Sequence, residues 1–571
     1  MSTSSMGLVT DSVSDSIFAA TAPVVSSARP EPGRLLNASV EGCDLIFVTN
    51  RGPIEHSFAA DGAPAAQRGA GGVVSGLLCA ARNQQVSWIA LTMTDADREV
   101  ATRLGNRALL NPAGLHDMSL RLVAVSPEMY AAHYDGFSNR VLWFAQHGLA
   151  PERRPALSAI RAYWQQGYVP VNAAIADAVV QQARVQGPRT PIMFHDYHLY
   201  KAPALVRAKL PEARLLHFIH VPWPEVSAWG ELPTDIVRDI YEGLAACDVI
   251  SFQTERDAAN FLQGAQRYLP EARIAREAQE ITWHGRQALV RAHPIALTPS
   301  AVRASASAPG AQQRALELLT KARPHAGHKL LLRVDRIEPT KNIVRGFLAY
   351  ERILRDHEHL RGNVTFLALL VPSRESMPEY QDYAARVRDT IARINAAYGT
   401  AEWQPIVAVY GNDHQRALAC MSDYDVLLVN PLIDGMNLVA KEGGLLNARN
   451  GVILLSDGAG AYSQLRDGVL RVEPTDVEQT AAALYEALTM PDERRARLAQ
   501  EVRRTLLRED ASTWLSAQLD DLAIVRGITL PRLPAVPVPG LPRHTAPGNY
   551  DGRAIARTPA PAPNTMRTAG D

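Results

Sequence analysis

The chain has 571 residues, more than one hydrophobic core usually holds, so at least two domains are expected. Hydrophobic residues make up 47% and charged residues 21%, the composition of an ordinary soluble globular protein. Lys plus Arg and Asp plus Glu each number 59, and this balance argues against nucleic acid or an anionic membrane as the main partner, because both require a basic excess.

Cysteine placement and the N-terminal composition predict a cytoplasmic protein. The four cysteines lie far apart without a CxxC cluster, which argues against a disulfide framework or a structural zinc site. The first forty residues lack the basic and apolar segments of a signal peptide, and the sequence has no run of 18 apolar residues. Residues 1–40 and the Pro-rich stretch 530–571 are expected to be disordered tails.

Between these tails, short apolar runs alternate with longer helical patterns. The runs lie at 45–50, 191–196, 213–220, 247–254, 328–335, 364–371, 404–411, 424–431 and 451–458. Most are continuously apolar, which is typical of parallel strands covered on both faces by helices. Strands separated by helices indicate βαβ units, and this many strands exceeds what one sheet usually contains. We therefore predict an α/β fold of two Rossmann-like domains.

The best domain boundary is the proline-containing segment 292–302, which follows a short strand and precedes a new helical pattern. We therefore expect one Rossmann-like domain at 43–297 and a second at 298–509. A helix at 510–526 is expected to cross back onto the first domain.

Polar residues that directly follow the apolar runs are the candidate site residues, because ligands of open α/β sheets bind beyond the carboxyl ends of the strands. Arg51 follows the first run, and GAGG (69–72) leads into a helix. Glycines there could form a simple turn or a phosphate cradle at a helix N-terminus. The neighbouring Arg51 favours the cradle.

Histidines gather in HDYH (195–198) and HFIHVPWP (217–224). A zinc site is one interpretation, but the spacing lacks the helical HExxH frame. We favour hydrogen bonding, with Asp196 accepting from a sugar hydroxyl and His220 contacting the reacting sugar.

Two cations, Arg336 and Lys341, stand at a strand-to-helix turn in RVDRIEPTKN (333–342), an arrangement that suits a diphosphate. A solvated charged loop is the alternative. Arg374 follows the next strand as a second candidate for holding an anion.

The segment NPLIDGMNLVAKEGG (430–444) is the most informative one. Asp434 and Gly435 form a turn, and a helix then opens with free N–H groups that could hold a phosphate or a sugar hydroxyl. Glu442 lies where its side chain could reach a ribose diol, although an acid near a helix N-terminus is common for the helix dipole alone.

Together the motifs VTNRGP, GAGGVVSGL, FSNRVLWFAQH, HDYHL, HVPWP, DVISFQT, DRIEPTKN, PSRES and DGMNLVAKE resemble the trehalose-6-phosphate synthase family. They run in one order through about residues 43–525. The resemblance implies a retaining glycosyltransferase of the GT-B architecture, with the active site in the cleft between two domains. It also implies that the domain at 43–297 binds the acceptor and that the domain at 298–509 binds the nucleotide sugar.

The resemblance also implies roles for individual residues. Residues matching acceptor contacts are Arg51, Tyr134, Trp143, Asp196 and Arg374. Residues matching donor contacts are Gly72, His220, Arg336, Lys341, Asp434, Asn437, Leu438, Val439 and Glu442. Catalysis is expected to rest on His220, Asp196, Arg336 and Lys341.

In this family no metal is required, and the substrates are UDP-glucose or GDP-glucose and a sugar phosphate. Arg336, Lys341 and helix N–H groups would stabilise the charge that grows on the leaving diphosphate. Same-face attack would retain the configuration, with the donor phosphate accepting the acceptor's proton. The sequence leaves homo-oligomer formation open.

One position departs from the family pattern. Leu91, in SWIALTMTD (87–95), stands where a tryptophan is expected against the acceptor sugar. An alternative is therefore a (pseudo)glycosyltransferase acting on another phosphorylated acceptor, such as a cyclitol or polyol phosphate, in a branch near validoxylamine phosphate synthase. A non-catalytic regulator that binds sugar phosphates is a third interpretation. A Rossmann dehydrogenase is excluded, because no GxGxxG follows a strand with an acid some twenty residues on.

Overall fold

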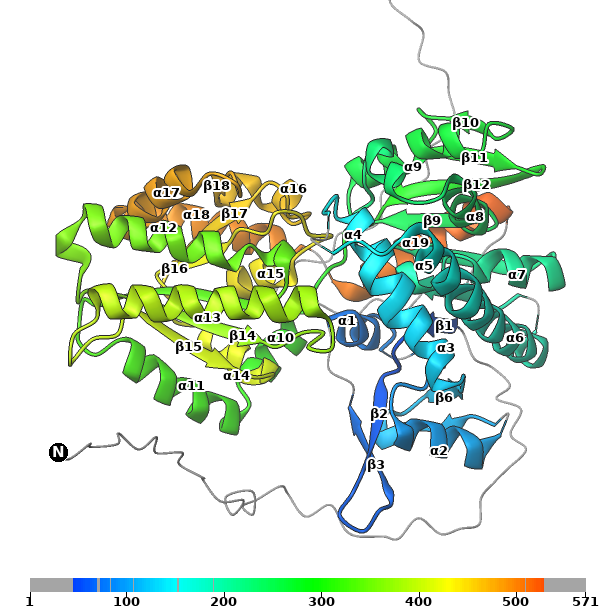
Figure 1. Ribbon diagram of the computed structural model, residues 1–571, viewed down its shortest axis with the longest axis horizontal. Coiled ribbons are helices and arrows are strands. Elements are labelled where there is room, and N and C mark those ends of the chain that lie inside the picture. The colour runs from blue at the N-terminus through cyan, green and yellow to red at the C-terminus, as the bar shows by residue number, and fades with distance from the viewer. Residues whose placement is uncertain are drawn as a thin grey trace, which may run out of the picture. The chain divides into compact units, whose positions relative to one another are not determined.

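A computed structural model describes residues 45–68, 72–82, 84–105, 107–150, 153–187, 189–508 and 510–527. The expected disordered tails at 1–40 and 530–571 lie outside these residues. The described chain alternates strands and helices, as Figure 1 shows. No helix in these ranges combines the length and apolar character needed to span a membrane.

The N-terminal half of the chain forms a ten-stranded sheet. Its strands are β1 (Leu45–Thr49), β4 (Val86–Leu91), β5 (Leu109–Leu110), β6 (Met118–Val123), β7 (Pro191–His195), β8 (Arg214–Phe218), β9 (Val249–Phe252), β10 (Arg273–Ala275), β11 (Glu280–Trp283) and β12 (Arg286–Ala292). Their order is β10-β11-β12-β9-β8-β7-β1-β4-β6-β5, and all pairs from β12 to β6 are parallel. A separate antiparallel hairpin pairs β2 (Ile54–Phe58) with β3 (Pro64–Arg68).

A second, wholly parallel sheet follows. Its strands are β13 (Lys329–Arg336), β14 (Val364–Val371), β15 (Ile406–Tyr410), β16 (Val426–Val429), β17 (Val452–Ser456) and β18 (Leu470–Val472). Their order is β15-β14-β13-β16-β17-β18. Each apolar run in the sequence coincides with a strand of one of the two sheets. The predicted α/β class is confirmed.

Helices connect the strands, and most of them bury an apolar face. In the first half they are α1 (Gly72–Ala80), α2 (Asp95–Leu104), α3 (Pro127–Ala131), α4 (Trp143–Gln146), α5 (Leu157–Tyr163), α6 (Val169–Gln186), α7 (Ala202–Lys209), α8 (Thr234–Ala245) and α9 (Glu255–Tyr268). A π-helical segment, Ala132–Leu142, joins α3 to α4. The later helices are α10 (Pro299–Ala306), α11 (Pro309–Ala322), α12 (Ile343–Asp356), α13 (Pro378–Tyr398), α14 (His414–Cys420), α15 (Leu438–Leu446), α16 (Tyr462–Leu465), α17 (Val477–Thr489), α18 (Asp492–Leu506) and α19 (Ala511–Arg526).

Helix α12 shows how the sequence directs this packing. Ile343, Phe347, Tyr350 and Leu354 recur at helical spacing and are fully buried. Each such side chain contributes about 1.5–3 kcal/mol by leaving water. The burial of this face fixes the start of α12, next to the loop that carries Lys341.

The chain changes sheet between Ala292, where β12 ends, and Lys329, where β13 begins. Helix α19 packs near the first sheet: the Trp514 indole donates to the His293 carbonyl at 3.0 Å, and its ring centroid lies 4.9 Å from that of Phe218. We keep the domain limits 43–297, 298–509 and 510–526 as a proposal.

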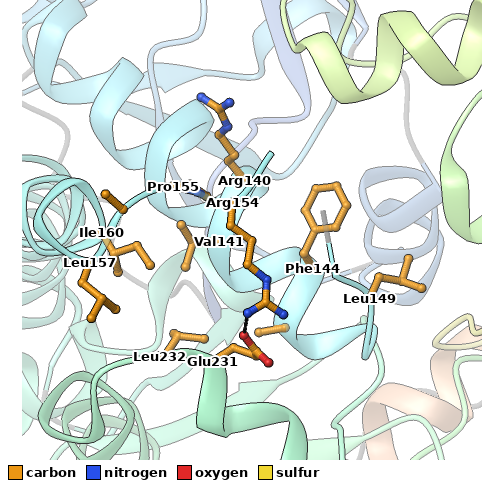
Figure 2. Close-up of a pocket in the computed structure, with 12 residues that line it drawn as sticks. Arg140, Val141, Phe144, Leu149, Arg154, Pro155, Leu157, Ile160, Glu231 and Leu232 are labelled. Atoms are coloured by element: carbon orange, nitrogen blue, oxygen red, sulfur yellow. Dashed lines mark ion pairs between the residues drawn. The ribbon is translucent and has the colours of Figure 1, made fainter. Parts of the chain in front are cut away.

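A pocket of about 310 Å³ lies beside α4 and α5 (Figure 2). Its wall combines apolar side chains such as Val141, Phe144 and Ile160 with an Arg154–Glu231 ion pair. None of the site residues expected from the sequence lines this pocket.

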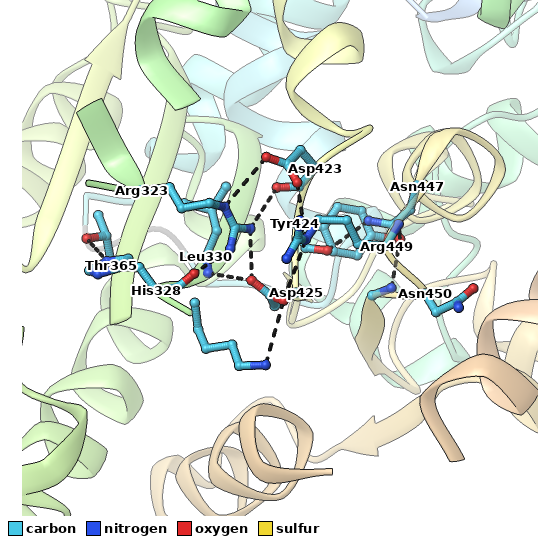
Figure 3. Close-up of polar contacts among 12 residues, drawn as sticks. Arg323, His328, Leu330, Thr365, Asp423, Tyr424, Asp425, Asn447, Arg449 and Asn450 are labelled. Carbon is cyan, nitrogen blue, oxygen red and sulfur yellow. Dashed lines mark hydrogen bonds and ion pairs between the residues drawn. The ribbon is translucent and has the colours of Figure 1, made fainter. Parts of the chain in front are cut away.

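A charged cluster surrounds Asp425 at the amino ends of β13 and β16 (Figure 3). The Asp425 carboxylate accepts the N–H of Leu330 at 2.8 Å and pairs with Arg323 at 2.8 Å and Arg495 at 3.3 Å. These bonds join the strand ends to neighbouring helices. The cluster is structural, because the expected site residues lie at the opposite, carboxyl ends of the strands.

Candidate active site

The loop after β13 carries two of the expected donor-site cations. Arg336 ends the strand, and Lys341 closes a short turn of 3₁₀ helix. Beneath the loop, the fully buried guanidinium of Arg333 donates to the Lys341 carbonyl at 2.9 Å and pairs with Asp335 at 2.8 Å. These bonds fix the main chain from which the Lys341 side chain extends.

Lys341 forms a short ion pair with Asp434. The Lys341 Nζ lies 2.5 Å from Asp434 Oδ2, which also accepts the Asn437 amide at 3.0 Å. Burial opposes the charged form of both partners, but their mutual attraction outweighs it, so the pKa of Asp434 is lowered and that of Lys341 is raised. At neutral pH this site therefore holds an ammonium beside a carboxylate.

Asn437 caps helix α15. Its φ is 70°, a left-handed conformation that asparagine tolerates, and its side-chain oxygen accepts a first-turn N–H at 3.3 Å. Leu438 and Val439 follow in the first turn, and Glu442 lies buried on the same helix. Glu442 Oε1 lies 3.3 Å from His414 Nε2. The first two turns of α15 thus carry both the residues that match donor contacts (437–439) and Glu442, the residue expected to bind the ribose.

Arg374 lies in a cage of aromatic rings. Its guanidinium carbon lies 5.0 Å from the ring centroid of Trp143 and 5.2 Å from that of Tyr380. It donates to the hydroxyl of Tyr380, and to that of Tyr197 at 3.2 Å. Arg374 also has a φ of 49°, an unfavourable backbone for this residue type, so the surrounding contacts hold the side chain at this point.

Glu338 lies between the two expected phosphate ligands. Its side chain is 1% exposed, and Oε1 lies 3.0 Å from Arg336 and 3.7 Å from Arg374. The hydroxyl of Ser373 donates to the same oxygen at 2.9 Å. Burial alone would raise the pKa of Glu338, but the two arginines and Lys341 outweigh it and lower the pKa to about 2.

Asp196 and His220 meet at the carboxyl ends of β7 and β8. The Asp196 backbone has a φ of 70°, and its carboxylate accepts the His220 N–H at 3.2 Å. Burial raises the pKa of Asp196 to about 6, and burial lowers the pKa of His220 to about 3. His220 is therefore a neutral imidazole, whose Nε2 lies 3.3 Å from His195 Nδ1.

Gly435 brings the Asp434 turn against His220. A Cβ built on Gly435 would lie 1.8 Å from the His220 carbonyl oxygen, so only glycine fits this approach. This backbone contact brings Asp434, which follows a strand of the second sheet, close to His220, which follows a strand of the first sheet.

Tyr134 forms a wall of stacked rings. It lies between Tyr130, at 5.4 Å between centroids, and His198, at 5.6 Å. The charge of Arg51 acts on both Tyr130 and His198, so the exposed Arg51 side chain belongs to the same region. Helix α1 begins at Gly72, and residues 69–71 of the GAGG motif lie outside the described chain.

Leu91 does not face this wall. It ends β4, is 1% exposed and packs in the hydrophobic core. Met93, two residues on, is partly exposed and its sulfur accepts hydrogen bonds from the Tyr130 hydroxyl and from Asn50. The position expected to hold an aromatic platform is thus a core position. Tyr130 lies beside Tyr134 instead, and Met93 contacts Tyr130.

Sequence reasoning missed several residues that complete the site. Glu338, Tyr197 and Tyr380 contact Arg374, but the sequence did not single them out, although Tyr197 directly follows the apolar run 191–196. Glu338 lies in the DRIEPTKN motif between Arg336 and Lys341, and an acidic residue between two cations could have indicated its role. Among the described residues, no group of three or more His, Cys, Asp or Glu side chains could hold a metal ion.

The chain is similar to known glycosyltransferases. A family model described as glycosyltransferase family 20 matches residues 44–524. A trehalose-6-phosphate synthase of Mycobacterium avium is 31% identical, over 85% of this chain and 96% of its own length. A bifunctional trehalose-6-phosphate synthase/phosphatase of Thermoproteus tenax is 33% identical over 76% of this chain, which spans 56% of that longer protein. A validamine 7-phosphate valienyltransferase of Streptomyces hygroscopicus is 28% identical over 84% of this chain and 95% of its own.

Solved structures give the same fold. The trehalose-6-phosphate protein of E. coli bound with UDP-2-fluoro glucose has a TM-score of 0.71 and 27% identity, covering 84% of this chain and 98% of that one. An α,α-trehalose-phosphate synthase of Burkholderia xenovorans in complex with glucose-6-phosphate has the same TM-score and identity, covering 84% of this chain and 99% of its own. The two-domain GT-B fold expected from the sequence is confirmed.

Proposed function

The chain belongs to glycosyltransferase family 20, and we propose that it transfers glucose from a nucleoside-diphosphate glucose to glucose 6-phosphate, giving trehalose 6-phosphate and a nucleoside diphosphate. One observation carries this proposal. The Lys341–Asp434 pair and the caged Arg374 lie in one network of buried charges, joined through Glu338. Such a network supplies cations for two separate phosphorylated ligands.

In this reaction the donor leaves as a nucleoside diphosphate, so negative charge grows on its phosphates. Arg336 and Lys341 stabilise that charge from fixed positions, which takes the place of a metal ion. Asp434 holds Lys341 in place, and Glu442 accepts from the ribose. We therefore propose that the transfer reaction requires no metal ion. We also propose the cytoplasmic location that the sequence predicts.

The acceptor is held from the other side. Arg374 and Arg51 bind its phosphate, and the rings of Trp143 and Tyr134 pack against the sugar. The Asp196 carboxylate accepts from a sugar hydroxyl, and neutral His220 contacts the reacting sugar. The residues contribute mainly orientation and exclusion of water, because the leaving diphosphate itself accepts the proton.

The absence of the expected tryptophan at Leu91 favours a second candidate, in which the same site accepts a cyclitol or polyol phosphate. Incubation of the enzyme with UDP- or GDP-glucose and each acceptor phosphate, followed by product analysis, separates the two. Trehalose 6-phosphate as the main product supports the first function. Release of nucleoside diphosphate only with another acceptor supports the second, and no release with any acceptor supports a sugar-phosphate-binding regulator.

The site predicts an acidic limb in the pH profile. Asp196 has a pKa of about 6, so below this pH its carboxyl is neutral and no longer accepts the acceptor hydroxyl. We expect kcat/KM to fall about tenfold per pH unit below pH 6, since this profile reports groups of the free enzyme. His220, with a pKa of about 3, contributes no limb in this range.

The acceptor phosphate also titrates near pH 6. Asp196→Asn separates the two effects: the limb that persists in this variant belongs to the substrate, and the limb that disappears belongs to Asp196. A profile identical in shape in both proteins would contradict the assignment.

Tyr130 is expected to support the acceptor through Tyr134. Tyr130→Leu removes the stacked ring, and we expect the acceptor KM to rise about 5-fold, equivalent to roughly 1 kcal/mol for one aromatic pair. Tyr130→Phe keeps the stack and serves as the control. An unchanged acceptor KM in Tyr130→Leu would remove this residue from the acceptor wall.

A further inference from the structure

Two guanidinium groups that serve different substrates share one buried carboxylate. Arg336 follows β13 and matches a donor-phosphate ligand, whereas Arg374 follows β14 and matches an acceptor-phosphate ligand. The same Glu338 oxygen lies 3.0 Å from the first and 3.7 Å from the second. Arg374 lies close enough to Arg336 for its positive charge to oppose the ionisation of Arg336.

The two positive charges repel each other, and this repulsion grows as water is excluded from the site. Arg336 has a side chain that is 56% exposed, so without a partner it is free to turn into solvent. Arg374 is held by rings and hydroxyls, and Glu338 forms an ion pair with it. One carboxylate thus contacts both cations.

Glu338 itself is firmly placed. It is 1% exposed, and the Ser373 hydroxyl donates to the same oxygen that contacts the arginines. Ser373 directly precedes Arg374, so this bond ties the loop after β14 to the loop after β13. The carboxylate therefore fixes the distance between the two loops as well as the two side chains.

We propose that Glu338 is a positioning residue for both substrates: it orients Arg336 toward the donor diphosphate and Arg374 toward the acceptor phosphate, so that both anions bind in register for transfer. The inference rests on the proposed function. Glu338 touches neither substrate in this role and acts through the two arginines.

Glu338→Gln tests the inference, because glutamine keeps the shape and removes the charge. We expect the KM for donor and for acceptor each to rise about 10-fold and kcat to fall about 10-fold, as pre-organised phosphate ligands are lost. Glu338→Asp keeps the charge and should restore part of each effect. Glu351→Gln, in an exposed pair with Arg393 on α12 and α13, is the matched control and should change none of them.

Double variants identify the route of the effect. In an Arg336→Ala background, Glu338→Gln should no longer change the donor KM but should still raise the acceptor KM. In an Arg374→Ala background, Glu338→Gln should no longer change the acceptor KM but should still raise the donor KM. Equal effects in both backgrounds, or an effect on one substrate alone in the parent enzyme, would overturn the proposal.

Binding measurements keep this test independent of turnover. Calorimetry with UDP and, separately, with inorganic phosphate should show about 10-fold weaker binding of both ligands to Glu338→Gln. If the parent enzyme transfers no sugar, the proposed function fails, while this binding result still decides the role of Glu338. Should Glu338→Gln fail to fold, Ser373→Ala gives a milder loss of the same orientation, with an expected 2- to 3-fold weakening of both ligands; no weakening of either would overturn the proposal.

Discussion

We expect Arg374→Ala to raise the KM for the phosphorylated acceptor at least 100-fold, about 2.7 kcal/mol, while the donor KM changes less than threefold. The guanidinium lies among Trp143, Tyr197 and Tyr380, which orient it but carry no charge of their own at neutral pH. Removing it leaves an aromatic cage without a cation for the phosphate. Steady-state kinetics with each substrate varied in turn measures both constants.

Two further variants define what the acceptor requires. Arg374→Lys keeps the charge and loses the planar fork, so an intermediate acceptor KM is expected. Arg393→Ala removes an exposed arginine that pairs with Glu351 on α12, and it should leave both constants unchanged. Equal increases in the acceptor and donor KM for Arg374→Ala would contradict the assignment of this residue to the acceptor phosphate.

The sequence predicted the fold well where strands are buried on both faces. Runs such as 328–335 and 364–371 are continuously apolar because helices cover both sides, and they became β13 and β14. The antiparallel pairing of β10 with β11 and of β11 with β12 was not predicted. Strands β10 and β11 are short and only partly buried, so their side chains carry little apolar signal.

The sequence indicates the cationic residues of the candidate site but not the residues that hold their side chains in place. Lys341 and Arg374 follow strands, and that rule finds them from sequence. Tyr380 lies in the first turn of α13 and Tyr197 in the turn after β7, and only tertiary packing brings both to Arg374. Leu91 shows the converse limit: its position in the motif suggested a ligand contact, but it is the last residue of a strand with every residue buried.

Lys341 carries the largest expected effect on the chemical step. Lys341→Ala should lower kcat about 1,000-fold, roughly 4 kcal/mol, because a fixed cation at the leaving diphosphate acts on charge that develops only in the transition state. The donor KM should change much less, since ground-state binding retains Arg336 and the N–H groups at the start of α15. Single-turnover measurements separate this chemical step from product release.

The same change leaves Asp434 without its cation. That carboxylate is 19% exposed and keeps the Asn437 amide as a hydrogen-bond donor, so its lowered pKa should rise in the variant. A carboxylate close to the diphosphate then repels the leaving group, which adds to the loss of kcat. Lys341→Ala combined with Asp434→Asn should recover part of the rate, because the second change removes the unpaired charge.

A matched pair elsewhere controls for the removal of a Lys–Asp contact as such. Lys201 lies 2.8 Å from Asp239 and is similarly shielded, with a side chain 22% exposed, but it stands at the start of α7, outside the group of residues around Lys341 and Arg374. Lys201→Ala should therefore leave kcat within about twofold. If Lys341→Ala lowers kcat no more than Lys201→Ala, then Lys341 does not stabilise the leaving diphosphate, and the charge must be met by Arg336 and the helix N–H groups alone.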